Sequence, residues 1–405
     1  MKIHIKKQTS FNKNNNGVFK LTKRATWIAC GIVLGVICVL MTIAAFCDYQ
    51  IDYILAKPAL PTPRWDGSAK ETLGFIYTND VIGRIVEIIG TGPCIIATVA
   101  ALVIFHQNAY RIVRKGLRLT VQIGTIAVAL MWVIYACFFQ FFPLLIVSTV
   151  GVTDYGKISP LDSYGNINNG YTALLYLVFG AVMGGLIIGP CWLIIRRINK
   201  QTIAELLRYA FILTSASIIA ILLVEIAIKP TLQRERFRFL YAYNGVSMTM
   251  NPKSAMWTSD PQHLIGGSND PYGGFHNWYA LPITPYGYGA PGNLPFISED
   301  ASKSFPSGHE TMAAVGFYSL VCLPFTCKQC SGKKVRIALF VTAILGSAIV
   351  GFYRIRAGAH YLSDVTIGTL LAVGLLFIFH MYYCYGCSYL DKWCNLKINA
   401  NRRNI

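Results

Sequence analysis

The stretch Ser304-Phe305-Pro306-Ser307-Gly308-His309 opens an apolar run near the C-terminal third of the chain. Pro306 and Gly308 favour a turn, and the residues after His309 have the composition of a helix. A turn followed by a helix presents backbone N–H groups and the Ser307 hydroxyl at a helix N-terminus, where an anion can bind. A histidine there can exchange a proton with a bound anion near neutral pH. Alone, such a stretch is more often an ordinary turn and cap, so its meaning depends on its surroundings.

The composition is that of a membrane protein. Of the 405 residues, 54% are hydrophobic and only 13% are charged, and the mean hydropathy is positive. These figures exclude an ordinary soluble domain. The net charge is +18, but the Lys and Arg residues lie in tails and short loops between apolar runs. This placement favours topology signals and attraction to anionic lipid over nucleic-acid binding.

The apolar runs predict an all-α fold, a polytopic membrane bundle of about eight transmembrane helices. Each run is about long enough to cross a hydrocarbon core of roughly 30 Å. The first is long for a signal peptide and is followed by only a loose cleavage site, so we expect a retained anchor. The runs lie near 26–47, 83–106, 119–147, 171–195, 203–229, 309–326, 336–353 and 361–385.

Short basic segments alternate with poorly basic loops along the chain, so all the basic groups fall on one side of the membrane. The positive-inside rule assigns that side, with both termini, to the cytoplasm of a cell bounded by its plasma membrane. The basic groups are the N-terminal tail, Arg111/Arg114/Lys115/Arg118, Arg196/Arg197/Lys200, Lys328/Lys333/Lys334/Arg336 and Lys392/Lys397/Arg402/Arg403. The loops 48–82, 148–170, 230–305 and 354–360 are then expected to face outward.

The predicted layout has four parts. Residues 1–25 form a Lys-rich cytoplasmic tail, expected to be disordered, and 26–118 a transmembrane pair with an outer loop. Residues 119–385 form a six-helix core that includes the outer loop 230–305, and 386–405 form a second cytoplasmic tail. The long loop is rich in Gly, Pro and aromatic residues. It is either a lid over a lipid headgroup or a set of interfacial anchors.

Three groups of polar side chains fall where the last helices reach the outer face. The topology was derived from other residues, yet it places all three groups on one face of the membrane. That coincidence is the main argument for a functional site. The groups are Lys229 and Arg236; Ser307, Gly308 and His309; and Arg354, His360 and Asp364.

These side chains suit the cleavage of a phosphate ester. The two arginines and the lysine can hold a dianionic phosphoryl group and neutralise charge that develops in the transition state. His360 and Asp364 are four residues apart, which predicts a shared helix face with the carboxylate bonded to the ring. His309, on a different helix, can protonate the leaving oxygen. No cofactor and no catalytic metal are implied.

Simpler explanations exist for each residue taken alone. Arg354 and Lys229 could snorkel at helix ends, and His360 with Asp364 could be a structural pair. Glu225 lies one turn before Lys229, and we expect it to be an ion-pair partner rather than a catalytic group. For the residues to have no common function, each of these separate explanations would have to hold at once on the same face of the membrane. A single functional site explains all of them together.

The three groups resemble the motifs of the type 2 phosphatidic-acid phosphatase and vanadium haloperoxidase superfamily. Those motifs read Lys-x6-Arg-Pro, Pro-Ser-Gly-His and Ser-Arg-x5-His-x3-Asp. This chain matches them at 229–236, 306–309 and 354–364, with Phe237 in place of the Pro and Tyr353 in place of the Ser. The resemblance covers roughly 119–385, the family's six-helix core, and leaves the first two spans outside it.

The resemblance implies a role for each matching residue. His360 would be the nucleophile that becomes phosphohistidine, Asp364 its orienting carboxylate, and His309 the general acid. The departures at Phe237 and Tyr353 bear on substrate fit and rate more than on mechanism, because every charged participant is present. The phosphate-binding set would be Lys229, Arg236, Ser307, Gly308 and Arg354.

We therefore expect an integral-membrane lipid phosphate phosphatase that acts on the outer leaflet. Candidate substrates are a polyprenyl pyrophosphate, phosphatidic acid and phosphatidylglycerophosphate. One alternative keeps the phosphohistidine but passes the phosphoryl group to an acceptor lipid or glycan. Another is a non-enzymatic transporter or scaffold with the same fold. The sequence does not determine the oligomeric state.

Two C-x-x-C pairs fall at the predicted cytoplasmic ends of helices. Together they could form a four-cysteine structural zinc site that ties the helix ends together. Reduced, unliganded cysteines or lipidated ones are the alternative. The residues concerned are Cys327, Cys330, Cys384 and Cys387.

Overall fold

A computed structural model describes residues 23–56, 81–111, 114–136, 170–232, 234, 236–237 and 304–386. These residues form helices joined by short turns and contain no strand, which confirms the all-α prediction. Both predicted tails, apart from a few residues, and nearly all of loop 230–305 lie outside the described ranges. The long helices in the described part are α1 (Lys23–Ala56), α3 (Val81–Asn108), α4 (Lys115–Ala136), α7 (Gly170–Ile195), α8 (Lys200–Ile221), α11 (Gly308–Thr326), α12 (Lys333–Arg356) and α13 (Leu362–Met381).

The membrane character expected from the sequence is confirmed by the length and hydropathy of these helices. Within the described ranges, five helices are long and apolar enough to cross a membrane, or six if the two limbs of α1 form one span. This is fewer than the predicted number of about eight. The stretch Gly180–Ile195 of α7 is a further, shorter apolar helix, and α11 is not among the five.

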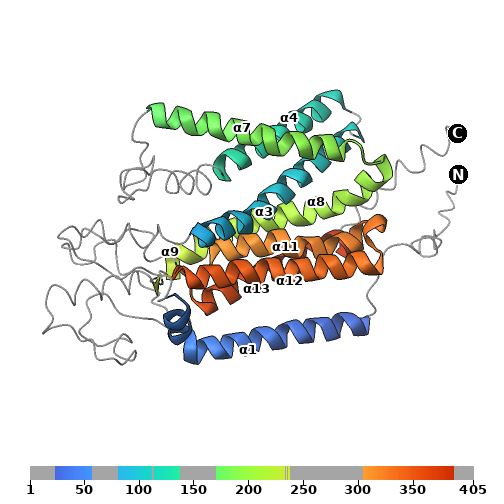
Figure 1. The fold of residues 1–405 in the computed structure, drawn as a ribbon. Helices are drawn as coiled ribbons and strands as arrows, with labels where there is room; N and C mark the ends of the chain where they lie inside the picture. The colour runs from blue at the N-terminus through green and yellow to red at the C-terminus, as the bar shows by residue number, and fades with distance from the viewer. Residues whose placement is uncertain are drawn as a thin grey trace, which may run out of the picture.

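The helices run back and forth along one axis (Figure 1), and the connections therefore fall at two ends. α11 and α13 begin, and α12 ends, at the same end as the short helix α9 (Lys229–Leu232). α4, α8 and α12 begin at the opposite end. The predicted basic groups that precede those three helices therefore lie away from α9.

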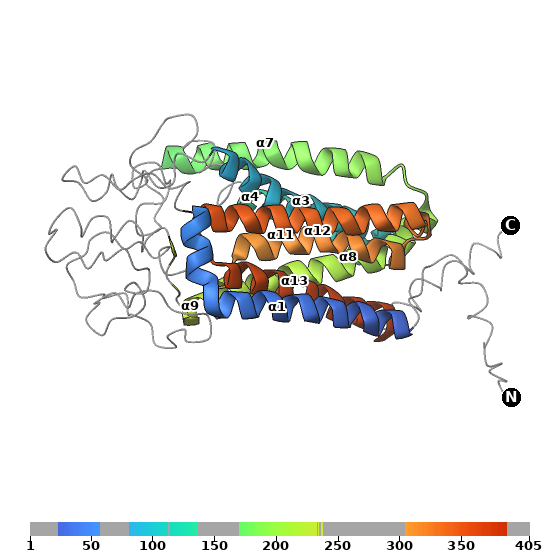
Figure 2. The same ribbon diagram turned by 60° about the horizontal axis from the view of Figure 1, so that its bottom comes forward.

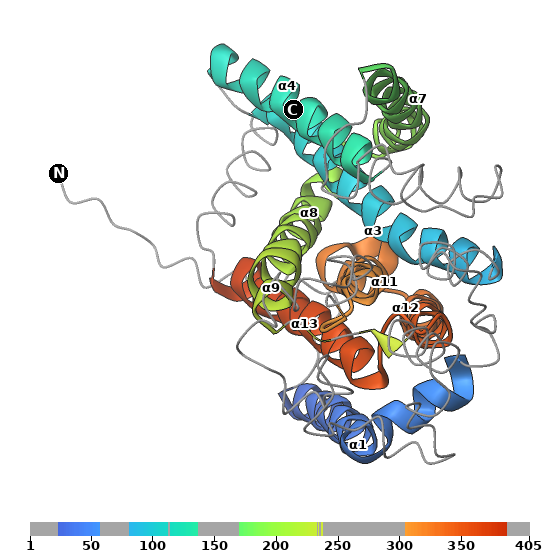
Figure 3. The ribbon, with the colours of Figure 1, turned by 90° about the vertical axis from the view of Figure 1, so that its left-hand side faces the viewer.

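The packing centres on α11, which contacts α3, α8, α12 and α13. α1 packs against α13 and α12, whereas α4 and α7 pack mainly on α3 and on each other. The end-on view in Figure 3 shows α4 and α7 set to one side of the other helices. The helices that pack against α8, α11, α12 and α13 are thus α1 and α3. The predicted domain boundary at residue 118 stays a prediction.

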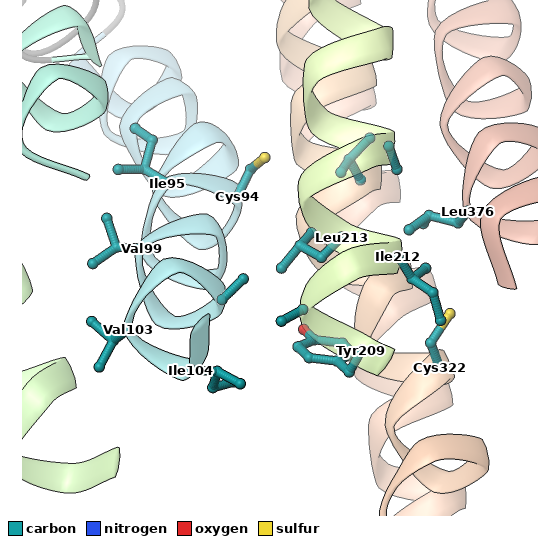
Figure 4. Packing of buried hydrophobic residues seen from close by; sticks show 14 of the residues in the cluster. Cys94, Ile95, Val99, Val103, Ile104, Tyr209, Ile212, Leu213, Cys322 and Leu376 are labelled. Atoms are coloured by element: carbon teal, nitrogen blue, oxygen red, sulfur yellow. The ribbon is translucent and has the colours of Figure 1, made fainter. Parts of the chain in front are cut away.

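The apolar core joins α3, α8, α11 and α13 (Figure 4). A Cβ atom at Gly316 on α11 would lie only 2.5 Å from the backbone nitrogen of Cys94 on α3. A glycine is therefore needed where these two backbones approach. The Tyr209 hydroxyl on α8 lies 3.0 Å from the Ser319 hydroxyl on α11, which pairs a buried polar group. This close packing gives the site a rigid frame.

α1 is bent where it reaches the end of the bundle that contains α9. Its two limbs, Gly35–Asp48 and Gln50–Ala56, meet at 77°. Figure 2 shows the second limb turned across that end of the bundle. Asp48 is the last residue of the first limb, and it is buried.

Candidate active site

The polar groups predicted from the sequence meet at the end of the bundle where α9 lies. The charges of Arg354, Arg236, Lys229 and His309 all lie close enough to His360 to act on its protonation. A Cβ atom at Gly308 would lie 2.9 Å from Lys229 Nζ, so the start of α11 touches the start of α9. Except for His309, which is half-buried, these side chains are at most 6% exposed. The three motifs therefore form one buried, strongly cationic cluster.

A π-helix, η5 (Leu222–Ile228), sets the direction of Lys229. The Lys229 N–H donates to the carbonyl of Val224, five residues earlier, instead of the residue four back. Short π-helical segments often mark functional positions, because they rotate the residues that follow. Lys229 Nζ donates to Glu225 Oε1 at 2.7 Å, which confirms the predicted ion pair.

The turn before α11 is held by its own cap and by α13. Ser307 is the N-cap, and its Oγ accepts from the Glu310 N–H at 3.3 Å. The Ser307 N–H donates to the carbonyl of Asp364 at 3.1 Å, so the first turns of α11 and α13 are tied together. The Ser307 hydroxyl proton can still be donated to an anion at this helix N-terminus.

The sequence predicted that His360 and Asp364 share a helix face and bond directly, and this detail is wrong. α13 begins at Leu362 with Tyr361 as its N-cap, so His360 precedes the helix and the i, i+4 geometry does not apply. The His360 Nδ1 lies 3.7 Å from Asp364 Oδ2 but only 2.6 Å from the carbonyl oxygen of Ser304. A carbonyl can only accept, so Nδ1 carries the proton and Nε2 carries the lone pair.

Asp364 reaches His360 through Ser304 instead. The Ser304 hydroxyl donates a short hydrogen bond to Asp364 Oδ2, while the Ser304 carbonyl accepts from His360 Nδ1. The same Oδ2 accepts from the Tyr361 N–H at 2.9 Å, which forms a capping box at the start of α13. Asp364 thus fixes the backbone segment that fixes the imidazole.

Arg234 is the partner of the other Asp364 oxygen. Its Nη1 donates to Asp364 Oδ1 at 2.5 Å and to Ser363 Oγ at 2.6 Å. Its Nη2 donates to Asp48 Oδ2 on α1 at 2.9 Å. The guanidinium lies over the Tyr361 ring, 4.0 Å from its centroid. Burial disfavours the charged form, but Asp364 and Asp48 together raise the pKa of Arg234 above its usual value, so it stays cationic.

The cationic surroundings also determine the protonation of His360. Burial has the largest effect, and the charges of Arg354, Arg236, Lys229 and His309 add to it. Together they hold the pKa of His360 well below its usual value of about 6.5. The imidazole is therefore neutral at pH 7, with Nε2 free to attack an electrophile held by the cations.

The two departures from the family motifs have different surroundings. Phe237 is fully buried, so an apolar ring packs where the family has a proline. Tyr353 is half-buried at the end of α12, and its ring meets that of Phe352 edge-on, with the centroids 5.6 Å apart. Neither change displaces a charged residue of the cluster.

The zinc hypothesis stays a prediction. Cys387 lies outside the described residues. Among those that are described, no three His, Cys, Asp or Glu side chains are placed to hold a metal ion. The sulfur of Cys384, in the short segment η10 (Tyr382–Gly386) after α13, lies 3.6 Å from Nδ1 of His380.

Ser304, Arg234 and Asp48 are part of the site but were not predicted to be. Ser304 acts through its carbonyl, which any residue type could supply. Arg234 lies among the six unspecified residues of the first motif, beside other arginines. The sequence did offer a signal for Asp48. It is a carboxylate at the boundary of an apolar span, and such residues are candidate functional residues by default.

Comparison with known proteins agrees with this geometry. No solved structure matches the chain. The family model of the PAP2 superfamily matches residues 205–386, a segment that contains all three groups of site residues. Proteins of this superfamily are generally hydrolases of the phosphatase type. The segment that carries the buried cationic cluster around His360, residues 205–386, therefore matches the PAP2 superfamily.

Proposed function

We propose that this protein is an integral-membrane lipid phosphate phosphatase that forms a phosphohistidine at His360. One observation carries the proposal. His360 is buried with its Nδ1 proton bound to a carbonyl, which leaves Nε2 as a nucleophile beside Lys229, Arg236 and Arg354. Such a site suits a phosphate or pyrophosphate monoester, because the cations hold the phosphoryl oxygens while the imidazole attacks phosphorus.

The proposed reaction has two steps. In the first, Nε2 of His360 forms a bond to phosphorus while the bond to the ester oxygen breaks, and His309 gives its proton to that oxygen. In the second, His309 takes a proton from water, the water oxygen bonds to phosphorus, and the N–P bond breaks to release inorganic phosphate. The phosphohistidine carries positive charge on its ring, which the nearby Asp364 carboxylate stabilises at 3.7 Å.

The position of the site supports the proposal of a lipid substrate at the outer face. α12 exposes large apolar side chains along its length, as expected for a helix in contact with lipid: Val335, Ile337, Phe340, Leu345, Ile349 and Phe352. The cationic cluster lies at one end of the bundle, where a headgroup would enter from the membrane boundary. The basic segments before α4, α8 and α12 lie at the other end, and the positive-inside rule assigns that end to the cytoplasm.

The test is phosphate release by the purified protein in lipid vesicles, with a chelator present. The panel is phosphatidic acid, phosphatidylglycerophosphate and a polyprenyl pyrophosphate. The His360→Ala variant is expected to lose at least about a thousandfold in kcat, because the nucleophile is gone. The matched control is His380→Ala, which removes a half-buried histidine near the far end of α13. Unchanged turnover in His360→Ala would refute the nucleophile assignment.

The same assay separates the alternatives when the phosphoryl group is labelled. A hydrolase releases the label as inorganic phosphate, with or without added acceptor. Label that moves only to an acceptor lipid or glycan would identify a phosphotransferase. A protein that binds the lipid phosphates but turns over none of them would be a transporter or scaffold.

A further inference from the structure

The helix that precedes the PAP2 segment reaches into the catalytic centre. α1 ends its first limb at Asp48, more than 150 residues before the family match begins at residue 205. Asp48 is 1% exposed, and both of its carboxylate oxygens are used. Oδ1 accepts from the Ser363 N–H at 3.0 Å, and Oδ2 accepts from Arg234 Nη2 at 2.9 Å and from the Ser363 hydroxyl. α1 is thus bonded to both Arg234 and the first turn of α13.

We infer that Asp48 is a positioning residue of the active site, which acts through Arg234 on Asp364 and so on His360. The inference rests on the proposed phosphatase function and assigns a role to α1 in that reaction. Asp48 touches neither the reacting nitrogen nor the phosphate-binding cations, so its effect must pass through Arg234 and Ser363 to Asp364, and from there to Ser304.

The chain of contacts is continuous and buried at every step. Arg234 lies between two carboxylates, with Nη2 on Asp48 and Nη1 on Asp364. Asp364 then holds Ser304, whose carbonyl holds His360. All these groups are at most 1% exposed, so water cannot replace a partner that is lost. Without Asp48, the guanidinium loses one of its two carboxylates, which weakens the constraint that holds its other amino group on Asp364.

The competing explanation is that Asp48 only anchors α1 to the bundle. That role would affect folding, but it would not lower kcat selectively in the folded protein. Coupling between Asp48 and Arg234 substitutions would then appear in the free energy of unfolding and not in kcat. The two explanations therefore differ in the kinetics of folded variants.

The experiment measures kcat and KM for phosphate release by Asp48→Asn. The expected result is a fall of about 10- to 100-fold in kcat, the size usual for a lost outer-shell partner of a functional residue. KM is expected to stay within about threefold, because Lys229, Arg236 and Arg354 are untouched. In an Arg234→Gln background, Asp48→Asn is expected to cause a smaller fall in kcat than in wild type, because the path through Arg234 is already broken and only the contact with Ser363 remains.

The matched control is Asp52→Asn, one turn further along α1. Asp52 is also fully buried, but among the residues that the structure describes neither of its oxygens has a hydrogen-bond partner. Its substitution is expected to leave kcat and KM within about twofold of wild type. Equal kcat for Asp48→Asn and Asp52→Asn, or independent effects of Asp48→Asn and Arg234→Gln, would overturn the inference.

Two further measurements keep the test decisive. If Asp48→Asn does not fold, Ser363→Ala replaces it, since this change keeps both charges and removes the hydroxyl that contacts Asp48 and Arg234. Its kcat is expected to fall at least threefold, and wild-type kcat there would contradict the inference. If the wild-type protein releases no phosphate, or if His360→Ala leaves its turnover unchanged, the proposed function and the inference are both refuted. If His360→Ala is inactive but Asp48→Asn has the kcat of wild type, the inference alone is refuted.

Discussion

Gly308→Ala tests whether the start of α11 and Lys229 form one phosphate site. The added Cβ would lie 2.9 Å from Lys229 Nζ and closer still to Glu225 Oε1. Glu225 is exposed and can move aside, but Lys229 is 6% exposed and is confined. Its ammonium must shift by about half an ångström to reach an ordinary contact distance, since such contacts begin at 3.4 Å.

That shift removes the ammonium from the position where it would bind a phosphoryl oxygen. A hydrogen bond to a charged group contributes about 1.5–3 kcal/mol. Losing it corresponds to a fall of about 10- to 150-fold in kcat/KM, at about 1.4 kcal/mol per factor of ten. We expect most of the loss in KM if Lys229 binds the ground-state phosphate, and in kcat if its contact tightens only in the transition state.

The assay is the initial rate of phosphate release over a range of lipid phosphate concentrations. Gly374→Ala on α13 is the matched control, because a Cβ at that position meets no atom within 4 Å. A glycine-to-alanine change in an open helix position is expected to be neutral or mildly stabilising. A folded Gly308→Ala protein with kcat/KM within twofold of Gly374→Ala would refute the reasoning.

Two further predictions concern stability. The lowered pKa of His360 means that below pH 6.5 the unfolded chain binds a proton that the folded protein does not, so acidification should destabilise the fold by up to about 1.4 kcal/mol per pH unit. Melting temperatures between pH 7.5 and 5.5 should therefore fall more for wild type than for His360→Asn, and parallel slopes would contradict this. Glu310 is 1% exposed and joins α11 to the hydroxyls of Ser347 on α12 and Thr369 on α13. Glu310→Ala should cost about 2–4 kcal/mol, through lost hydrogen bonds and a cavity, whereas Glu310→Gln keeps an acceptor and should cost less than half as much. Equal losses of melting temperature in the two variants would show that the carboxylate charge itself is required.

The sequence alone was sufficient to predict the helices and the convergence of the charged residues. Apolar runs separated by short basic loops define helix ends without any knowledge of packing. Once Lys229, His309 and His360 are assigned to the same membrane face, their approach requires only that the helices pack together. These parts were predictable because each depends on local composition and chain order.

The hydrogen bonds within the site were not predictable in the same way. The i, i+4 relation of His360 and Asp364 has its usual meaning only inside a helix, and α13 starts between them at Leu362. Helix boundaries are uncertain by one or two residues in a sequence, and here that uncertainty decides which group holds the imidazole. Ser304 holds it with a backbone atom, which leaves no trace in the residue type.

The contact between the first span and the site was not predicted from the sequence. The family resemblance covers roughly 119–385 and leaves that span outside it. In the structure, Asp48 of α1 contacts Arg234 across 186 positions of the chain. Contacts between residues so far apart in the chain depend on how the helices pack together. The hydrophobic pattern of a single span does not specify that packing.

The π-helical segment before Lys229 makes the winding of the backbone more important there than residue identity. Each residue of an α-helix turns the chain by about 100°. If the same seven residues, Leu222–Ile228, wound as an ordinary α-helix, the lysine would turn away from Gly308, because a π-helix turns the chain less per residue. Many apolar side chains could occupy those positions, because the hydrogen-bond pattern of the backbone directs the lysine.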